Sequence, residues 1–195
     1  MTSNYKLSLA TKTLENVDPK AKPVLENVKA SMGMIPNMYG DMANLPAMLQ
    51  TYAQGYSLFR AESGFTPAEQ EVVFLTISRE NECHYCMAAH SFVADNVSKV
   101  PLQVTNAIRD DESIADSKLA TLSAFTRTMF ATRGHPSKAD VANLLQVGYS
   151  EIHILSIVLA LAVKTISNYS NHVFDTSLDS AFAGRTWERP INSLP

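Results

Sequence analysis

Residues 71–90 read EVVFLTISRENECHYCMAAH and contain both cysteines of this 195-residue chain, Cys83 and Cys86. His90 follows the second cysteine by four positions, and Glu71 precedes the first by twelve. If a helix begins at Cys83, the two sulfurs and the imidazole fall at i, i+3 and i+7 and share one helix face. A dithiol, a helix N-terminus that favours a thiolate and a base that accepts a proton are what thiol chemistry needs. The stretch therefore predicts a thiol-based site.

A C-x-x-C motif on its own has three readings: a redox dithiol, part of a zinc site, or two buried thiols without chemistry. Structural zinc takes four Cys or His ligands, and this chain has no further cysteine. A metal site would have to combine Cys83, Cys86 and His90 with His84 or a carboxylate. Because intracellular C-x-x-C pairs are commonly catalytic or metal-binding, the redox reading is preferred, and the other two stay open.

The array of Glu71, the C-x-x-C motif and His90 resembles the AhpD-like alkylhydroperoxidases of the carboxymuconolactone decarboxylase superfamily. The flanks are similar to its peroxidase-related branch, with MIPN at 34–37, LPA at 45–47, GYSE at 148–151 and NYSNH at 168–172. The resemblance covers most of the chain and implies an all-helical, oligomeric fold. It also implies reduction of hydroperoxides by Cys83, Cys86, His90 and Glu71, with an outside dithiol protein or small thiol as reductant.

One position departs from the family pattern. The best-studied members have a histidine immediately before the second cysteine, whereas this chain has Tyr85 there and His84 one place earlier. Many relatives of unknown substrate share the tyrosine. The departure bears on the peroxidase activity and leaves the expected fold unchanged.

Four further residues are candidates for the wall of the site. Tyr85 and His84 lie within the motif, and His84 is expected to be exposed because it is off the face of the cysteines. Met87 follows the motif; core filling is its ordinary role, and a flexible wall for an apolar hydroperoxide is the alternative. His172 is included because it follows Asn168 and Asn171 in a cluster that the family resemblance places near the site.

Composition indicates a globular protein rather than a disordered one. Hydrophobic residues make up 46% of the chain and charged residues 18%, with a formal net charge of −3. This charge and the absence of a basic run argue against nucleic-acid or anionic membrane partners. The N-terminal residues lack the apolar core of a signal peptide, and the apolar segment 152–163 is interrupted by His153 and Ser156. A cytoplasmic location is expected, where a C-x-x-C pair is kept reduced unless it turns over.

Proline, glycine and capping residues divide the chain into helices without any strand-like alternation. The fold class is predicted to be all-α, as one domain over 1–195 with an N-terminal arm at 1–16 and a C-terminal tail at 176–195. Asp18 with Pro19, Thr66 with Glu69, and Ser137 with Asp140 are predicted helix starts. The apolar run in 72–77 predicts a central buried helix, and 151–171 the most apolar one.

Two larger-scale features are also predicted. Sliding the sequence by 82 residues places Glu69 on Glu151, Cys86 on Asn168 and His90 on His172, which suggests a degenerate repeat of two helical hairpins. The tail carries Phe182 and Trp187, and apolar tails commonly dock on something. We expect a homo-oligomer, as a dimer, trimer or hexamer, with the tail on a neighbouring subunit.

The mechanism expected from these residues is a peroxidase cycle. His90 takes the proton of Cys86, Glu71 orients the imidazole, and Cys83, at an exposed helix tip, forms the disulfide with the oxidised Cys86. The reverse assignment of the cysteines stays open, because a helix N-terminus favours Cys83. The sequence has no phosphate loop or dinucleotide motif, so no cofactor is expected. Alternatives are a redox-sensing or disulfide-exchange module, a metal-binding or structural oligomer, and a decarboxylase-like enzyme.

Overall fold

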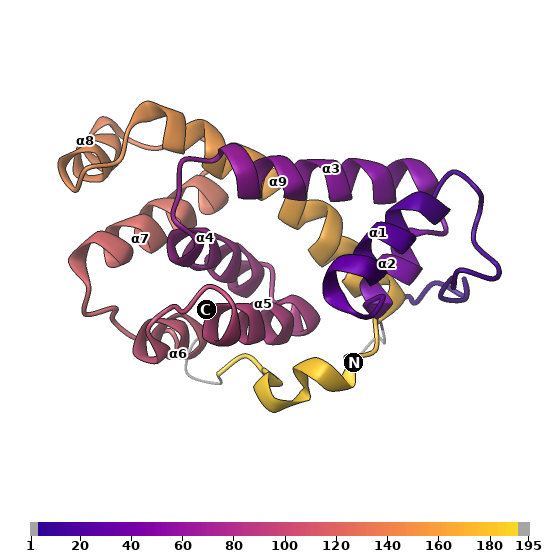
Figure 1. Cartoon of the computed structure of the whole chain (residues 1–195). Coiled ribbons are helices and arrows are strands. Elements are labelled where there is room, and N and C mark those ends of the chain that lie inside the picture. Colours follow the sequence, from indigo (N-terminus) through magenta and orange to yellow (C-terminus); the bar gives the residue numbers. More distant parts are fainter. Residues whose placement is uncertain (1–3, 191–195) are drawn as a thin grey trace.

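The computed structural model describes residues 4–190, and this part of the chain consists of helices and loops without a strand (Figure 1). The predicted all-α class is confirmed. The helices are α1 (Lys22–Met32), α2 (Asn37–Met42), α3 (Pro46–Glu62), α4 (Pro67–Glu80), α5 (His84–Asn96), α6 (Leu102–Asp110), α7 (Ser117–Ala131), α8 (Lys138–Gln146), α9 (Glu151–Phe174) and the 3-10 helix η1 (Ser180–Arg185).

Helix α4 is the centre of the bundle. It begins at a capping box, in which Thr66 and Glu69 each accept a hydrogen bond from the other's backbone N–H. Every residue from 69 to 79 is buried, and α4 packs against α5, α6, α7 and α9. The predicted central buried helix is confirmed, and it carries Glu71 into the interior.

The helix that follows begins where the sequence placed the break. Asn81 ends α4, and Glu82 adopts a left-handed backbone conformation with φ of 56°. Cys83 is then the N-cap residue of α5, with extended backbone angles. This sharp turn lays α5 back against α4, so that residues nineteen apart in sequence, Glu71 and His90, come into contact.

Helix α9 lies across the bundle beside α3 and also contacts α2, α4, α5 and α7 (Figure 1). By length and composition it could span a membrane, since an 18-residue window has a mean hydropathy of 1.5. Its packing gives it another role here, because its buried face carries the polar residues Lys164, Asn168 and Asn171 against the interior. It serves as a core helix of the bundle.

The first helix begins later than predicted. Asp18 was expected as the N-cap with Pro19 behind it, but α1 starts at Lys22 with Ala21 as its N-cap. The carboxylate of Asp18 instead accepts from the backbone N–H of Lys20 at 2.7 Å, within a turn. An Asx turn and an N-cap use the same side-chain hydrogen bond, so the local signal was the same for both.

Residues 4–13 of the predicted N-terminal arm have no helix, and the arm is hydrogen-bonded to the bundle at several points. The backbone N–H of Leu7 donates to Val173 in α9, and that of Lys12 donates to Gly40 in α2. Gly40 allows this approach, since a Cβ there would lie 2.6 Å from the side chain of Thr11. Residues 1–3 lie outside the described part of the chain.

The tail folds back on its own chain. Phe182 and Trp187 are both buried, η1 packs on α5, and the indole N–H of Trp187 donates to the carbonyl of Arg109 at 2.9 Å. The predicted contact of the tail with a neighbouring subunit therefore does not rest on these two aromatic residues, and it stays a prediction. Their apolar surface is already covered by α5 and α6, while residues 191–195 lie outside the described part.

Tyr85 is the anchor of this tail. Its hydroxyl donates to the buried carboxylate of Asp179 at 2.5 Å, and Asp179 also accepts from the backbone N–H of Asn37 at 3.2 Å. Burial, then Asp179, raise the pKa of Tyr85 far above its ordinary value. Tyr85 therefore keeps its proton and has a structural partner, which separates it from proton transfer at the cysteines.

Tyr85→Phe should accordingly destabilise the protein without changing its thiol chemistry. Loss of a hydrogen bond to a charged group costs about 1.5–3 kcal/mol in unfolding free energy. For a chain of this size that lowers Tm by about 3–12 °C. Thermal unfolding by circular dichroism measures this effect, and an unchanged Tm would show that Tyr85 does not hold the tail.

The predicted repeat of two hairpins is not what the fold contains. The first segment, from Glu69 to His90, crosses the break between α4 and α5. The second, from Glu151 to His172, lies on the single uninterrupted helix α9. The break residues Asn81 and Glu82 correspond to positions 163 and 164, where α9 continues without interruption, so the hairpin is not repeated.

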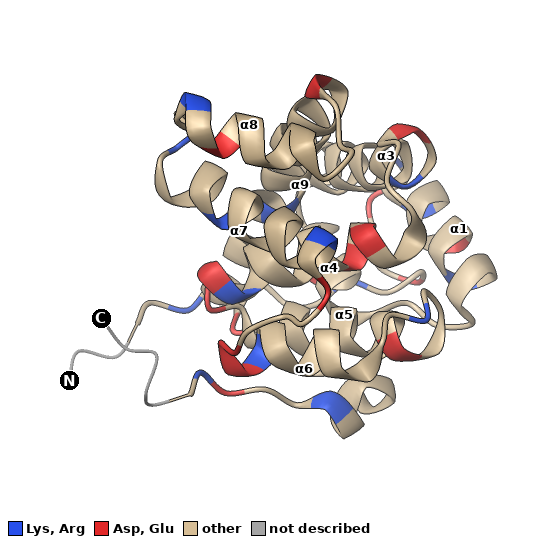
Figure 2. Ribbon diagram, turned by 90° about the vertical axis from the view of Figure 1, so that its left-hand side faces the viewer, with Lys and Arg blue, Asp and Glu red and all other residues tan. Residues whose placement is uncertain are grey.

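Charged residues of both signs are interspersed over the elements rather than gathered into a basic face in the view of Figure 2. Many of them are paired across helices, as Arg127 is with Glu80 and Arg185 with Asp95. This pattern agrees with the mild net charge of the chain, and it leaves the chemistry of the interior as the distinctive feature.

Candidate functional site

The carboxylate of Glu71 is fully buried and contacts two other side chains. One of its oxygens lies 2.8 Å from Nδ1 of His90, and the other pairs with Arg60 of α3. Burial by itself raises the pKa of Glu71, but His90 and Arg60 outweigh it and hold that pKa below its usual value. An ionised carboxylate accepts only, so Nδ1 of His90 carries the proton and its Nε2 is left as the reactive nitrogen.

Arg60 is itself held in place by its own helix and by α4. It donates to the hydroxyl of Tyr56 at 2.7 Å and to the side-chain carbonyl of Gln70 at 3.1 Å, and its guanidinium lies 4.9 Å from the ring centre of Phe74. These contacts of Arg60 hold it against the carboxylate oxygen of Glu71 that does not face His90. The predicted contact of Glu71 with His90 is present, and Arg60 is a partner that sequence reasoning missed.

The two cysteines lie at the start of α5 as free thiols. Cys86 is 2% exposed and Cys83 is 0% exposed. The expectation of an exposed helix tip at Cys83 is therefore wrong. An N-cap position is normally near solvent, but here the C-terminal half of α9 packs over the start of α5.

The cover over the cysteines is a polar face of α9. The side-chain amide of Asn171 donates to both sulfurs, at 3.2 Å from Cys86 and 3.6 Å from Cys83. Ser167, one turn earlier, lies with its hydroxyl oxygen 4.0 Å from the sulfur of Cys86. One amide nitrogen that contacts both sulfurs places the dithiol in a single polar pocket.

The two thiols differ in acidity. Burial raises the pKa of Cys86, but the hydrogen bond from Cys83 and the charge of Lys164 outweigh it and place that pKa well below its ordinary value. The hydrogen bond with Cys86, then burial, raise the pKa of Cys83 well above its ordinary value. Burial and the charge of Lys164 lower the pKa of His90, which keeps its imidazole neutral. The arrangement favours a thiolate at Cys86 and a thiol at Cys83.

A cavity of about 580 Å³ adjoins the dithiol from the side of Cys83. Its lining is mainly polar and comes from the turn between α4 and α5, the end of α9 and the N-terminal arm. Three of the four predicted wall residues line it, namely His84, Tyr85 and His172. The fourth, Met87, is fully buried and is not part of this lining, which favours its reading as core filler.

The described contacts of the two histidines in this cavity are with other groups than the sulfurs. His84 is exposed as predicted, and its Nδ1 lies 2.8 Å from the carbonyl oxygen of Trp187. His172 is exposed and its ring stacks against Tyr169, at 6.3 Å between centroids. Its neighbour Asn171, about 100° further round the helix, is the residue that touches the cysteines.

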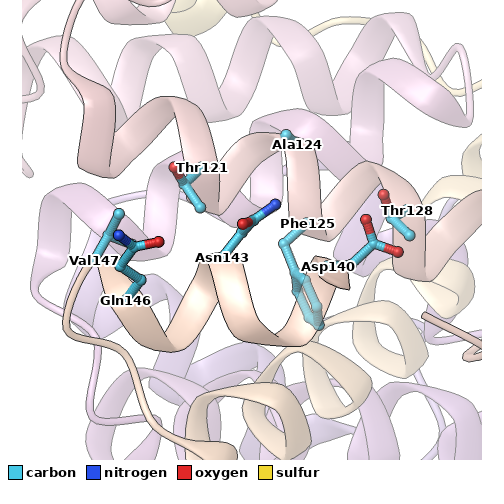
Figure 3. Close-up of a pocket in the computed structure, with 8 residues that line it drawn as sticks. All are labelled: Thr121, Ala124, Phe125, Thr128, Asp140, Asn143, Gln146 and Val147. Carbon is cyan, nitrogen blue, oxygen red and sulfur yellow. The ribbon is translucent and has the colours of Figure 1, made fainter. Parts of the chain in front are cut away.

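A second hollow, of about 280 Å³, lies between α7 and α8 (Figure 3). Thr121, Phe125 and Asn143 are among its lining residues, and it contains no cysteine or histidine. Its one acidic residue, Asp140, is occupied in the predicted capping box with Ser137. This hollow has no reactive group, so the dithiol cavity is the candidate site. The described residues include no cluster of three His, Cys, Asp or Glu side chains placed to hold a metal ion.

Comparison with known proteins supports the fold through structure alone. No family model matches the chain, and no curated protein matches its sequence. A solved alkylhydroperoxidase AhpD core, an uncharacterized peroxidase-related protein from Ralstonia eutropha JMP134, superimposes with a TM-score of 0.80 at 19% identity, covering 92% of this chain and 97% of that one. An uncharacterized peroxidase-related protein from Silicibacter sp. TM1040 gives 0.78 at 18% identity, covering 93% and 95%.

A third solved structure with this fold is the debrominase Bmp8, with a TM-score of 0.71 at 19% identity over 86% of this chain and 90% of that one. The chain therefore has an AhpD-like fold. The same fold includes peroxidase-related proteins and an enzyme of a different reaction, so the chemistry of this chain has to be argued from its own site.

Proposed function

We propose that the protein is a thiol-dependent peroxidase that reduces hydroperoxides with the dithiol of Cys83 and Cys86. The observation that carries the proposal is the unequal pair of thiols under Asn171, next to a His90 that is oriented by an ionised Glu71. A peroxidatic cysteine needs a thiolate, and a resolving cysteine needs to lie beside it. Both conditions favour Cys86 as the nucleophile.

The first step consumes the hydroperoxide. The thiolate of Cys86 attacks the terminal peroxide oxygen, a sulfur–oxygen bond forms, the oxygen–oxygen bond breaks, and an alkoxide leaves. Nε2 of His90 carries a proton from the Cys83 thiol to this alkoxide, which leaves as the alcohol. The sequence predicted that His90 deprotonates Cys86. Because Cys86 starts without a proton, His90 instead protonates the alkoxide that leaves.

The second step forms the disulfide and the third restores the dithiol. The Cys83 thiolate attacks the sulfenic sulfur of Cys86, and the hydroxide that leaves becomes water with a proton from solvent. A dithiol partner, protein or small molecule, then attacks the disulfide, is itself oxidised to a disulfide, and returns two electrons and the Cys83 proton. The cavity beside Cys83 is the approach for the dithiol partner, and the reducing cytoplasm would supply that partner.

The proposal is tested by turnover and stoichiometry together. Purified protein is mixed with cumene hydroperoxide, hydrogen peroxide or 2,3,4-tribromopyrrole, the compound bound in a solved complex of debrominase Bmp8. Dithiothreitol is the reductant, and product and free thiol are counted. The proposal expects one alcohol per two thiols lost, and repeated turnover with reductant. Slow oxidation without turnover would favour a redox-sensing or disulfide-exchange module, and bromide release without hydroperoxide reduction would favour a debrominase-like reaction.

The partner expected on the surface is a second copy of this chain. Helix α9 exposes an apolar stripe on the side away from Lys164 and Asn171: Ile152, Leu155, Val158 and Val173. Exposed apolar patches of this length mark interaction surfaces. Light scattering should give a multiple of 21.4 kDa. Leu155→Glu should shift the mass toward the monomer, whereas Leu102→Glu, at an exposed leucine off the stripe, should not; a wild-type monomer would contradict the prediction.

A further inference from the structure

Lys164 is a buried cation in the middle of α9. Its exposure is 0%, and its Nζ makes no hydrogen bond within residues 4–190. The ring centre of Phe74 lies 5.6 Å from Nζ, and Lys164 also acts on the thiol of Cys86. Lys164 is one turn before Ser167 and two turns before Asn171, so it belongs to the same face of α9 that covers the dithiol. A fully buried ammonium without a carboxylate partner requires an explanation.

The buried carboxylates of the described residues all have partners other than Lys164. The carboxylate of Glu71 is paired with Arg60 and His90. The other buried carboxylates are satisfied elsewhere, as Glu69 is by Lys118 and Asp179 by Tyr85. Within the described residues this leaves Lys164 without a carboxylate. Cys86 can become an anion, and its sulfur lies against Ser167 and Asn171 on the same face of α9 as Lys164.

We propose that Lys164 is the counterion that holds Cys86 as a thiolate in the dry interior of the bundle. Removal of an isolated ammonium from water is costly unless an opposite charge accompanies it, and the same holds for a thiolate. Each therefore stabilises the other across a medium that screens weakly. The inference concerns the site of the proposed function, but ionisation of a thiol is measurable without any hydroperoxide.

Several titratable groups face the same space and would also contribute. They are Glu71 of α4, Cys83 and His90 of α5, Arg60, Tyr52 and Tyr56 of α3, and Tyr39 of α2. Arg60 is already matched by Glu71, and the buried tyrosines keep their protons because burial raises each pKa. Lys164 is thus the cation of this set without another anion.

The experiment measures the ionisation of Cys86 in Cys83→Ser protein, in which a hydroxyl still donates to the remaining thiol. Alkylation by iodoacetamide and absorbance at thiolate wavelengths are followed against pH. Lys164→Met and Lys164→Gln are then introduced separately, with Lys138→Met on exposed α8 as the matched loss of a lysine. Circular dichroism checks the fold of each variant, and replacement of a buried ion by an apolar side chain is commonly tolerated.

The proposal expects the Cys83→Ser parent to titrate well below ~8.5, the ordinary thiol value. Lys164→Met and Lys164→Gln should raise this value by about 1–3 units, the range typical of a lost neighbouring charge. At neutral pH the alkylation rate should fall about tenfold for each unit. Lys138→Met should leave the curve unchanged.

Two results would overturn the proposal. If the parent itself titrates at or above ~8.5, no counterion is acting, whatever the lysine variants do. If folded Lys164 variants superimpose on the parent curve, Lys164 is a structural cation over Phe74. If the Lys164 variants raise the pKa of Cys86 as expected but the protein does not turn over hydroperoxide, the counterion role stands. Only the peroxidase function is then contradicted.

Discussion

Cys86→Ser should abolish hydroperoxide reduction, while Cys83→Ser should still reduce one hydroperoxide per chain and then stop. Loss of the nucleophile in a covalent mechanism removes the reaction itself, so we expect a fall of roughly 10³-fold or more in rate. Without Cys83 the attack still occurs, more slowly because the alkoxide takes its proton from solvent, but no disulfide can form, and Cys86 remains as sulfenic acid. Cys86→Ser should therefore show no reaction, whereas Cys83→Ser should show a single turnover.

Rapid quenching with dimedone followed by mass spectrometry of the peptide around residue 86 separates these outcomes. Cys83→Ser should accumulate the dimedone adduct at Cys86 in one equivalent, and wild type should show little of it. Asn171 touches both sulfurs, so both single variants keep a hydrogen-bonding partner in the pocket. If Cys86→Ser instead gave the single burst, with the adduct at Cys83, the assignment of the two cysteines would be reversed.

His90→Gln should slow oxidation of Cys86 by cumene hydroperoxide by about 10²–10⁴-fold, the range for lost proton-transfer catalysis. Glutamine keeps a hydrogen bond to Glu71 but cannot carry a proton to the alkoxide. The deficit should shrink with peracetic acid, because the acetate that leaves needs no proton. Glu71→Gln should act in the same direction but less, since it loses the orientation of the imidazole and leaves the imidazole in place.

Stopped-flow oxidation of each variant measures these rates, and His135→Gln, in an exposed turn after α7, is the matched control that should behave as wild type. Equal deficits with cumene hydroperoxide and peracetic acid would mean that His90 does not serve the leaving group. If both Glu71 and His90 variants matched wild type, the pair would be structural, and Glu71 would contribute only to packing and stability.

The helices and the first half of the site followed from local signals. The capping box at Thr66 and the break at Asn81 are sequence-adjacent features, so they predicted α4, the turn and α5 directly. Because α4 and α5 are neighbours in sequence with a short turn between them, the contact of Glu71 with His90 could also be predicted. The resemblance to AhpD-like proteins pointed to the same residues.

The second half of the site required knowledge of packing between distant elements. Lys164 and Asn171 are about 80 residues beyond the cysteines, and periodicity cannot say that α9 covers the start of α5. The same cover explains why Cys83 is buried although it is an N-cap. The available signal was the row of Lys164, Asn168 and Asn171 at i, i+4 and i+7, a polar stripe on the most apolar helix of the chain.

The central claim is that Cys86 reacts as a preformed buried thiolate beside Cys83. The most direct measurement is the stopped-flow rate of wild-type oxidation by cumene hydroperoxide from mild acid to about pH 9, with thiols counted at each point. A lowered pKa means that the thiolate is present at every pH above that value and is lost only as the pH falls through it. The account predicts a rate that is flat across neutrality and falls in acid, with loss of both thiols. A rate that climbs through ~8.5 like a free thiol, with loss of a single thiol, would contradict it.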